Sequence, residues 1–546
     1  MFARVKKSGK YQYLQIVENR KENGKVKQRV ITTLGRMDQL QEKGRVEALI
    51  HSLSRFSEKA LLIISGKSDV SADAKKIGPV LIFERLWVET GIKDAIQRLL
   101  IGRKYQFDVE RAIFLTVLNR LMVSGSDRNC DRWRRHYQIE GVDDLELHHL
   151  YRAMAFLGEE TVDQKDATPF SLRCNKDLLE ESLFFYRRHL FSELDIVFFD
   201  TTSIYFEGRG GKTIGQLGFS KDHRPDLKQM VVDAVINDKG CPICCEMWPG
   251  NTTDVKTLIP VIERLQARFP IKRVCIVADR GMISAATIET LESPDNPIPY
   301  ILGTRMRRVK AIRDKVLSRA GRYREVRPNG VRSQDPASLK VKEVMVDDTR
   351  YIVCQNSAQA RKEASDRENI VSALKAQLKK GAKSLVGNKG YRKYLNIDKD
   401  SVRIDTAKLK SETRFDGKWV LTTNTNLSAS DVALKYKELW QVERVFRDVK
   451  SLLETRPIFH QRDETIRGHV FCSFLALVLR KELQRRLERS GYDFEWLHIK
   501  QDLKALQRVE IEENGRRFFV RTQSQGECGK IFQAVGVAMP PTISEM

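Results

Sequence analysis

The 546-residue sequence lacks an apolar run long enough to cross a membrane. Its longest, VFCSFLALVL at 470–479, has about half the required length and predicts a buried helix instead. The first ten residues, MFARVKKSGK, are charged and contain no apolar segment, which is not the pattern of a secretory signal. We therefore expect a cytoplasmic protein without a membrane segment.

The sequence also lacks complete metal and nucleotide motifs. Its nine cysteines are scattered, and CPICC at 241–245 has no second ligand pair at the spacing of a closed zinc site. GGKT at 210–213 resembles the end of a phosphate-binding loop, but the glycine required five positions before Gly211 is Phe206. These absences predict reduced thiols, no structural zinc and no P-loop.

Positive charge is abundant. The chain has 96 Lys and Arg against 72 Asp and Glu, a net charge of +24, and 41% hydrophobic residues, enough for ordinary packed cores. A basic surface on a folded protein favours a polyanionic partner, because neutralising phosphates releases counterions. We therefore expect a nucleic-acid partner rather than a surface that is basic only for solubility.

Two regions precede the first chemically informative motif. Residues 1–36 carry ten Lys or Arg against two acids and predict two strands around a turn at Asn23 and Gly24. Between 78 and 160, apolar residues recur at intervals of three and four, which predicts helices. The basic segment around Trp133 makes this bundle either a DNA-reading module or a packing bundle with a solvated loop.

Two apolar strands are each predicted to end on an aspartate. The segment 196–199 leads to Asp200, and 274–278 leads to Asp279. Carboxylate oxygens suit Mg²⁺, and phosphoryl transfer on DNA often uses two such ions about 4 Å apart. Two aspartates alone would hold the ions poorly, so a third carboxylate is expected from elsewhere in the fold.

The segment 428–455 is predicted to be one long helix that supplies this third carboxylate, Glu443. Ser428 or Ser430 would cap it. On the helical projection, Glu443 lies at the edge of the apolar face. The aromatic and basic residues on the same edge are Tyr436, Trp440, Arg447 and Lys450. The alternative role for Glu443 is an i,i+4 ion pair with Arg447.

These residues resemble a known family. Asp200 in DTTS, Asp279 in ADRGM and Glu443 in the pattern Y-x2-L-W-x2-E-x6-K resemble the DDE transposases of bacterial insertion sequences. The third motif resembles the branch with Tyr-Arg-Glu-Lys, here Tyr436, Glu443 and Lys450. The basic start and GFSKDHRPDLKQ at 218–229 are also similar to one subgroup. The resemblance covers most of the chain.

One position departs from that pattern. Leu439 stands where the branch usually has arginine, so Arg444 or Arg447 would have to replace its phosphate contact. Between Asp279 and Glu443 lie 164 positions, too many for one connection inside a compact domain. In the resembled branch, a mostly β insertion occupies this interval.

The resemblance implies an α/β fold with a ribonuclease-H-like catalytic core, a mostly β insertion, an N-terminal basic hairpin and a helical DNA-binding region. The predicted regions, in chain order, are a hairpin module and linker (1–70), the helical region (71–190), the first part of the core (191–303), the basic insertion (304–415), the second part of the core with the Glu443 helix (416–490) and a C-terminal region (491–546).

It also implies partners and cofactors. Two Mg²⁺ ions, for which Mn²⁺ can substitute, would be held by the three acids. The partners would be double-stranded DNA, as transposon ends and as target, and a second copy of the chain in a synaptic homodimer. The reaction would be DNA cleavage followed by strand transfer.

Several basic and aromatic residues are candidate DNA contacts. Tyr436 and Lys450 would grip a phosphate, as the resemblance implies. For the others an ordinary alternative stays open. Trp440 either stacks a displaced base or packs, and Arg280 either steadies a phosphate or pairs with an acid. The basic residues that either contact the backbone or solvate a loop are Lys221, Arg224 and Lys228. Arg447 completes the set.

Two rival functions remain at this point. A ribonuclease-H-like nuclease or resolvase would cut DNA without joining it, and the formation of joined products separates the two. A catalytically inactive DNA-binding protein with a degenerate core would show no metal-dependent cutting. The sequence keeps all three acids intact.

Overall fold

The computed structural model describes residues 2–22, 25–42, 46, 71–168, 171–188, 196–271, 274–327, 339–380, 394–397, 402–448, 450, 455–513 and 516–545. They divide into two compact units. The first comprises Met1–Lys75, Gln507–Gln523 and Pro540–Met546, and the second comprises Lys76–Leu506 and Ser524–Met539. Most of the linker expected before residue 70 falls outside the described residues.

The first unit contains two antiparallel sheets. The N-terminal sheet has the order β1-β2-β3, with β1 (Phe2–Ser8), β2 (Tyr11–Glu22) and β3 (Lys25–Arg36). The predicted hairpin is therefore confirmed as β2 and β3, but a third strand was missed. The other sheet has the order β18-β17-β16-β4 and consists of β4 (Ser71–Lys76), β16 (Gln507–Glu513), β17 (Arg516–Arg521) and β18 (Ile543–Glu545).

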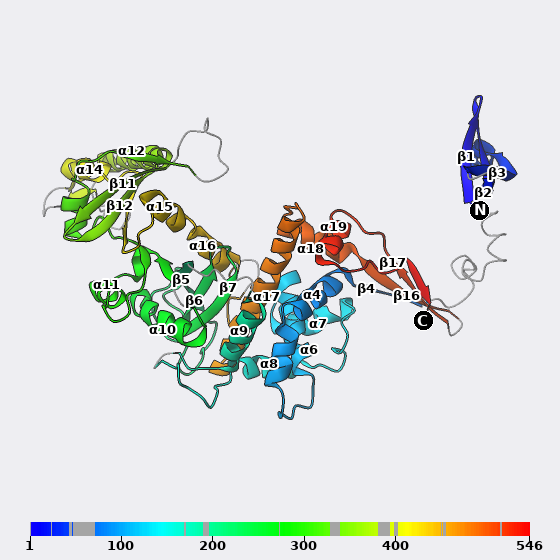
Figure 1. The fold of residues 1–546 in the computed structure, drawn as a ribbon, viewed down its shortest axis with the longest axis horizontal. Helices are drawn as coiled ribbons and strands as arrows, with labels where there is room; N and C mark the ends of the chain where they lie inside the picture. The colour runs from blue at the N-terminus through cyan, green and yellow to red at the C-terminus, as the bar shows by residue number, and fades with distance from the viewer. Residues whose placement is uncertain are drawn as a thin grey trace. The chain divides into compact units, whose positions relative to one another are not determined.

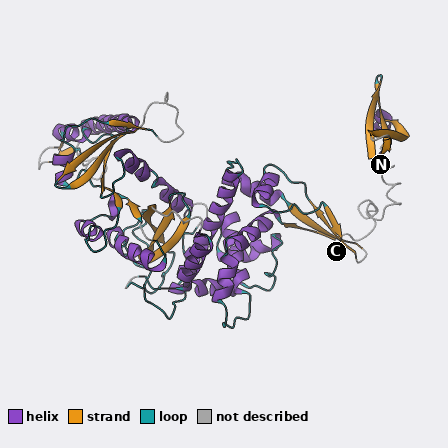
Figure 2. Cartoon of the chain, in the orientation of Figure 1, coloured by secondary structure: helices purple, strands orange, loops and turns teal. Residues whose placement is uncertain are grey.

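Helices dominate the start of the second unit, as the apolar spacing predicts (Figure 2). They are α4 (Gly78–Glu89), α5 (Ile92–Leu99), α6 (Val109–Met122), α7 (Asp127–Trp133), α8 (Leu147–Gly158) and α9 (Asn175–Tyr186). The long apolar run lies in α17 (Asp463–Arg489), which packs against α6 and α8. Residues 470–479 are buried there, so the prediction of a buried helix is confirmed.

The centre of the second unit is a nine-stranded mixed sheet with the order β10-β11-β12-β15-β9-β8-β5-β6-β7. Its strands are β5 (Ile196–Tyr205), β6 (Gln229–Asn237), β7 (Pro242–Pro249), β8 (Cys275–Ala278), β9 (Tyr300–Gly303), β10 (Arg324–Val326), β11 (Leu339–Val346), β12 (Thr349–Gln355) and β15 (Lys418–Thr423). Strand β5 is parallel to β8, and β8 is parallel to β9; the other neighbours are antiparallel.

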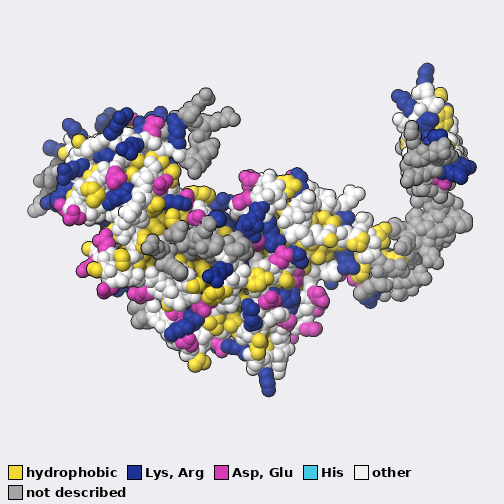
Figure 3. Space-filling model, in the orientation of Figure 1, with side chains coloured by type: hydrophobic (Ala, Val, Ile, Leu, Met, Phe, Trp, Pro, Cys, Tyr) yellow, Lys and Arg dark blue, Asp and Glu magenta, His cyan; other side chains and the backbone are white. Residues whose placement is uncertain are grey.

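The basic segment 304–415 contributes three strands to the central sheet. Its strands β10, β11 and β12 continue the central sheet beyond β15. It is also less purely β than expected, because it contains α12 (Ser357–Lys380) and α14 (Thr406–Thr413) besides the small pair β13 (Leu395–Ile397) and β14 (Val402–Ile404). Lys and Arg side chains are frequent over this part of the surface (Figure 3).

Helices cover both faces of the β5–β9 part of the sheet (Figure 1). Alternate strand residues such as Phe199 and Ile276 pack on one face with α10 (Leu258–Arg268) and α11 (Ala285–Leu291). On the other face, Phe198 and Val277 pack with α15 (Ala429–Lys437), α16 (Trp440–Arg447) and α17. The sheet is therefore buried on both sides, and its strand ends become the accessible positions.

A buried ionic cluster joins the helical region to the sheet. Its members, on α9, β7 and α10, are Lys176, Asp177, Glu180, Glu246, Arg264 and Arg268, and none is more than 2% exposed. Arg268 donates to Glu180 at 2.5 Å and to Glu246 at 3.1 Å, and Lys176 donates to Asp177 at 2.7 Å. Arg264 and Arg268 also contact the carboxylates of Asp166 and Glu181, respectively. Each buried charge therefore has partners of opposite sign, which makes its burial tolerable.

All nine cysteines are described, buried and free of disulfides, as expected for reduced thiols. Those of CPICC lie on or directly before β7. Among the helices that the structure describes, none is long and apolar enough to cross a membrane.

Candidate active site

Strand register brings the two aspartates together. Strand β5 pairs in parallel with β8 up to Phe199 and Ala278, so Asp200 and Asp279 follow on adjacent strands. The prediction that β5 ends on Asp200 was wrong, since the strand runs to Tyr205 and Asp200 pairs with Ala234 of β6. The carboxylate is nevertheless accessible, because β8 stops one residue before Asp279 and leaves that side of β5 unpaired.

Asp200 lies in a crowded negative environment. Its Oδ1 accepts a hydrogen bond from the Thr201 N–H at 2.7 Å. Burial raises the pKa of Asp200 to about 6, and the carboxylates of Asp279 and Asp254 add to the rise, while Lys221 and the Thr201 N–H oppose it. A carboxylate with this excess of negative charge around it is suited to a bound cation.

The third acid comes from a broken helix. The segment predicted as one helix is two, α15 and α16, with a break at Glu438 and Leu439. Ser428 caps α15, as one of the two predicted alternatives, by accepting from the Asp431 N–H. The helical projection assumed a continuous rotation and could not show the break. Leu439 is buried there with the apolar core, where an arginine would lose its water.

A pocket of about 410 Å³ is lined by both Asp279 and Glu443. Tyr436, Trp440 and Arg280 also line it. Glu443 is exposed, so its carboxylate is free to meet a ligand from solvent. Asp200 is not part of the lining and lies next to Asp279 by strand register.

Tyr436 orients Asp279 directly. Its hydroxyl donates to Asp279 Oδ1 at 2.9 Å, and burial together with this carboxylate raises the pKa of Tyr436. Gly303 at the end of β9 makes the contact possible, since a Cβ on Gly303 would collide with the Tyr436 hydroxyl. The tyrosine that was predicted to grip DNA thus donates a hydrogen bond to the carboxylate of Asp279.

The carboxylates of Asp200, Asp279 and Glu443 do not form one compact ligand set. Among the described residues, the only three metal-ligating side chains whose ligand atoms all lie within 4.8 Å are Asp127, His460 and His469. The oxygens of Asp200, Asp279 and Glu443 are therefore spread more widely. A wide spread suits two ions about 4 Å apart better than one ion, because the outer ligands of such a pair lie far from each other.

The Arg120 guanidinium already contacts the cluster formed by Asp127, His460 and His469. An Arg120 nitrogen lies 2.9 Å from His469 Nδ1, and another of its contacts is Asp127 at 3.8 Å. His469 Nε2 lies 3.1 Å from the Thr455 carbonyl, which fixes the proton on Nε2. Because the guanidinium takes the lone pair that a metal would need, we assign this cluster to packing of α6, α7 and α17.

Four of the predicted DNA contacts are exposed, namely Arg224, Arg280, Trp440 and Arg447. Three of the basic side chains form an ion pair with a neighbouring acid. Lys450 donates to Asp222 at 2.8 Å, Lys221 pairs with Asp254 at 3.1 Å, and Arg224 pairs with Asp226 at 3.0 Å. Lys228 is half-buried, and its carbonyl accepts from the Phe206 N–H.

Sequence reasoning missed several residues around the acids. Asp254 lies in the short turn before α10, and Asp222 follows Lys221 in the GFSKDHRPDLKQ segment. Arg305 donates to the carbonyls of Arg280 and Gly281 at 3.1 and 3.0 Å, which supports the loop after Asp279. Asp222 could have been found from the sequence, because it stands directly beside a residue that was already a candidate.

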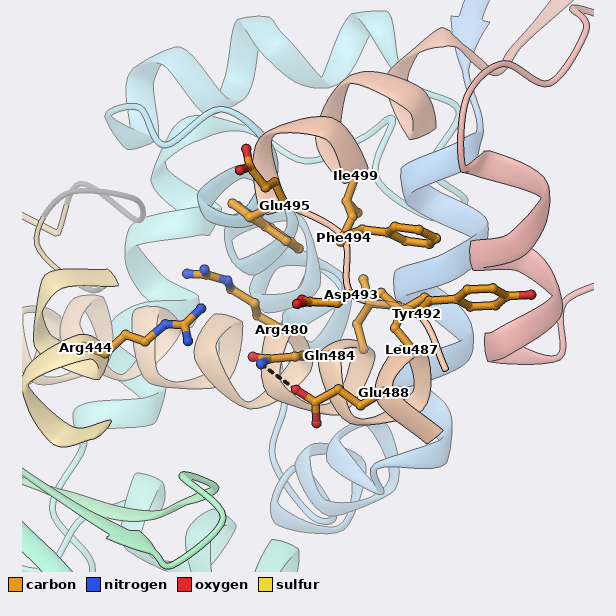
Figure 4. Close-up of a pocket in the computed structure, with 12 residues that line it drawn as sticks. Arg444, Arg480, Gln484, Leu487, Glu488, Tyr492, Asp493, Phe494, Glu495 and Ile499 are labelled. Carbon is orange, nitrogen blue, oxygen red and sulfur yellow. Dashed lines mark hydrogen bonds between the residues drawn. The ribbon is translucent and has the colours of Figure 1, made fainter. Parts of the chain in front are cut away.

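A second pocket, of about 440 Å³, lies beside α16 and α17 and contains none of the three acids (Figure 4). Arg444 from α16 and Arg480 from α17 point toward one another at one end, and Gln484 donates to Glu488 at 2.7 Å along its floor. Arg480 is held by Asp448 at 2.8 Å. Arg444, one of the two cations predicted to replace the missing arginine, thus lines this pocket, and its guanidinium lies 6.0 Å from the Trp440 ring.

Comparison with known proteins gives the class of the chain. The description "Transposase DDE domain" matches residues 192–479, more than half of the sequence, so the chain belongs to the DDE transposases. The description "IS1634 family transposase, N-terminal domain" matches residues 3–67, which identifies it as a transposase of an insertion sequence. The resemblance inferred from the motifs is confirmed.

The search for related proteins among curated sequences finds no match. A solved structure that the fold resembles is a piggyBac transposase synaptic complex with hairpin DNA, determined by cryo-EM. The two share 11% sequence identity, with a TM-score of 0.38 over 78% of this chain and 79% of that one.

Proposed function

We propose that this transposase binds the ends of its insertion sequence as double-stranded DNA and catalyses metal-dependent cleavage and strand transfer. The observation that carries the proposal is the arrangement of the acids. Asp200 and Asp279 lie side by side, in β5 and directly after the adjacent parallel strand β8, and Glu443 lines the same pocket as Asp279. Three carboxylates from distant segments repel one another when they lie close together, and a bound cation would offset this repulsion.

The core is proposed to be ribonuclease-H-like. Support comes from the order β7-β6-β5-β8-β9, in which three antiparallel strands are followed by two parallel ones. In this arrangement the first strand, β5, lies in the middle and carries Asp200, and β8 beside it leads to Asp279. The segment 304–415 enters after β9 and returns through β15.

Asp200, Asp279 and Glu443 would hold two Mg²⁺ ions, with Mn²⁺ as a substitute. The donor set fits, because the hard carboxylate oxygens of these three residues suit both ions. When bound, such ions supply an activated attacking oxygen and a stabilised leaving oxygen. Tyr436 keeps one lone pair of Asp279 occupied and so limits the rotamers of this acid.

The exposed basic and aromatic residues are proposed to contact DNA. Arg280 lines the pocket beside Asp279, where its guanidinium can pair with a phosphate. Trp440 is 53% exposed at the same pocket, which leaves its ring face available to an unstacked base. Arg447 lies exposed one turn beyond Glu443. A homodimer would place one such centre at each of the two transposon ends.

The test compares three conservative variants with a matched control. Asp200→Asn, Asp279→Asn and Glu443→Gln each remove one charge, and Glu438→Gln removes a charge at the helix break that is paired only with Lys435. We expect the first three to abolish cleavage of end-containing DNA with Mg²⁺ or Mn²⁺, while the control cleaves and all four bind DNA.

The products decide between the remaining functions. Covalently joined target and transposon strands identify strand transfer, whereas cut but unjoined DNA would indicate a nuclease or resolvase. Cleavage by any of the three acid variants at the rate of the unmodified protein would remove that residue from the centre. Absence of metal-dependent cleavage in the unmodified protein would favour a DNA-binding protein without activity.

A further inference from the structure

Two adjacent residues, Lys221 and Asp222, lie in the loop between β5 and β6 and connect with different parts of the active site. The Lys221 N–H donates to the Ser203 hydroxyl at 2.8 Å, which ties the loop to β5 just beyond Asp200. From this anchor, the Lys221 side chain runs to the aspartate strands and the Asp222 side chain to the region after α16.

The three protons of the Lys221 ammonium each have an acceptor. The Thr201 carbonyl lies at 2.8 Å, the Thr201 hydroxyl at 2.5 Å and Asp254 Oδ2 at 3.1 Å. A lysine has three donors and no acceptor, so this set saturates it. The residue that Lys221 contacts twice directly follows Asp200. The Lys221 contacts therefore fix the backbone that carries this catalytic acid.

Asp222 makes the complementary connection. Its side chain is 7% exposed, and Oδ1 accepts from Lys450 at 2.8 Å and also contacts Arg456. Lys450 lies seven positions after Glu443, and its own side chain is only 13% exposed. The two cations and the buried Asp222 carboxylate constrain one another strongly. Removing the carboxylate would leave the partly buried cations without their partner, and removing a cation would leave the carboxylate less compensated.

We propose, on the basis of the function proposed above, that Lys221 and Asp222 are positioning residues that hold the Asp200 strand and the Glu443 helix in the separation that the metal centre needs. Lys221 acts on Asp200 through Thr201, and Asp222 acts on Glu443 through Lys450. Neither touches the reacting atoms.

The arrangement has a physical rationale. Asp200 and Glu443 are 243 positions apart in the chain and lie on different secondary-structure elements. The carboxylates repel each other before a cation is bound, so the centre needs contacts from outside to keep them in place. Outer partners of metal ligands typically change affinity by about 10- to 100-fold when they are lost.

The experiment measures Mn²⁺ binding to the full chain without DNA, by the loss of the free Mn²⁺ signal in electron paramagnetic resonance. We expect Lys221→Met, Asp222→Asn and Lys450→Met to weaken binding by about 10-fold or more. The double variant Asp222→Asn with Lys450→Met should bind no more weakly than the weaker single one, because both remove the same connection.

Matched controls make the same chemical changes nearby. Asp226→Asn alters an exposed acid of the same loop, and Lys239→Met alters an exposed lysine at the next turn. Both should leave Mn²⁺ affinity unchanged. Circular dichroism and melting curves accompany every variant. If Asp222→Asn fails to fold, Lys450→Met tests the same connection from its other end.

Asp200→Asn serves as the reference that separates this inference from the proposed function. If Asp200→Asn loses Mn²⁺ binding while folded Lys221→Met and Lys450→Met keep it within twofold, the positioning role is refuted and the metal centre stands. If Asp200→Asn itself binds Mn²⁺ as the unmodified protein does, the metal centre fails, and the positioning role fails with it. Additive losses in the double variant would also refute the shared connection.

Discussion

The buried ionic cluster allows a stability prediction with a built-in pH dependence. Replacing Arg268 by methionine keeps most of the side-chain volume and removes a cation that contacts four carboxylates, those of Asp177, Glu180, Glu181 and Glu246. Glu180 and Glu246 then lose the guanidinium that contacts both of them. Breaking a buried pair in this way typically costs about 3–5 kcal/mol of the free energy of unfolding.

The protein has one way to limit this cost, which is to bind a proton. Burial already raises the pKa of Glu180, so this carboxyl is the expected site. Protonating a glutamate with an ordinary pKa of about 4.3 costs about 4 kcal/mol at pH 7 and about 2 kcal/mol at pH 5.5. The destabilisation by Arg268→Met should therefore approach 4 kcal/mol at pH 7 and fall to about half at pH 5.5.

Urea denaturation followed by circular dichroism, at both pH values, measures the difference. Arg313→Met is the control, because Arg313 pairs with Asp314 at the surface and its loss should have little effect at either pH. A destabilisation by Arg268→Met that is as small as that of the control would refute the view that the cluster is held by its charge balance. If the destabilisation by Arg268→Met is the same at pH 7 and pH 5.5, then proton binding by Glu180 does not limit it.

Two further predictions concern single side chains. Burial and the neighbouring Arg120 lower the pKa of His469 to about 4, so the unfolded chain binds a proton that the folded one rejects. Stability should fall by about 1.4 kcal/mol per pH unit from pH 6.5 to 4, and His469→Gln should flatten this part of the melting-temperature curve; equal slopes would contradict the assignment. Gly303→Ala should push the Tyr436 hydroxyl off Asp279, a hydrogen bond worth about 1.5–3 kcal/mol. Gly303→Ala and Tyr436→Phe should both slow cleavage about tenfold or more with DNA binding intact. Cleavage by Gly303→Ala at the unmodified rate would show that the contact does not matter.

Much of the catalytic half could be predicted because its signals are local. Apolar runs that end near a carboxylate predicted β5 and β8, and the two aspartates follow from parallel pairing of those strands. A buried strand leaves a strong local pattern, since every residue on it must be compatible with a core.

What could not be predicted depends on contacts between distant segments. The break at Leu439 has no glycine or proline to mark it, and it follows from how α15 and α16 separately pack on the sheet. The partners of Lys221 and Lys450, Asp254 and Asp222, are far from them in sequence or on another element. Periodicity describes one element at a time and contains no information about such pairs.

The continuation of the central sheet into residues 304–415 limits how this transposase can be shortened. Strand β15 pairs with β9 on one side and with β12 of the insertion on the other. Excising the insertion would uncover a row of unsatisfied amide groups within about 20 residues of Glu443, and bare edges of this kind recruit other chains. A minimal catalytic fragment of this protein would therefore need a capped or redesigned edge to avoid self-association.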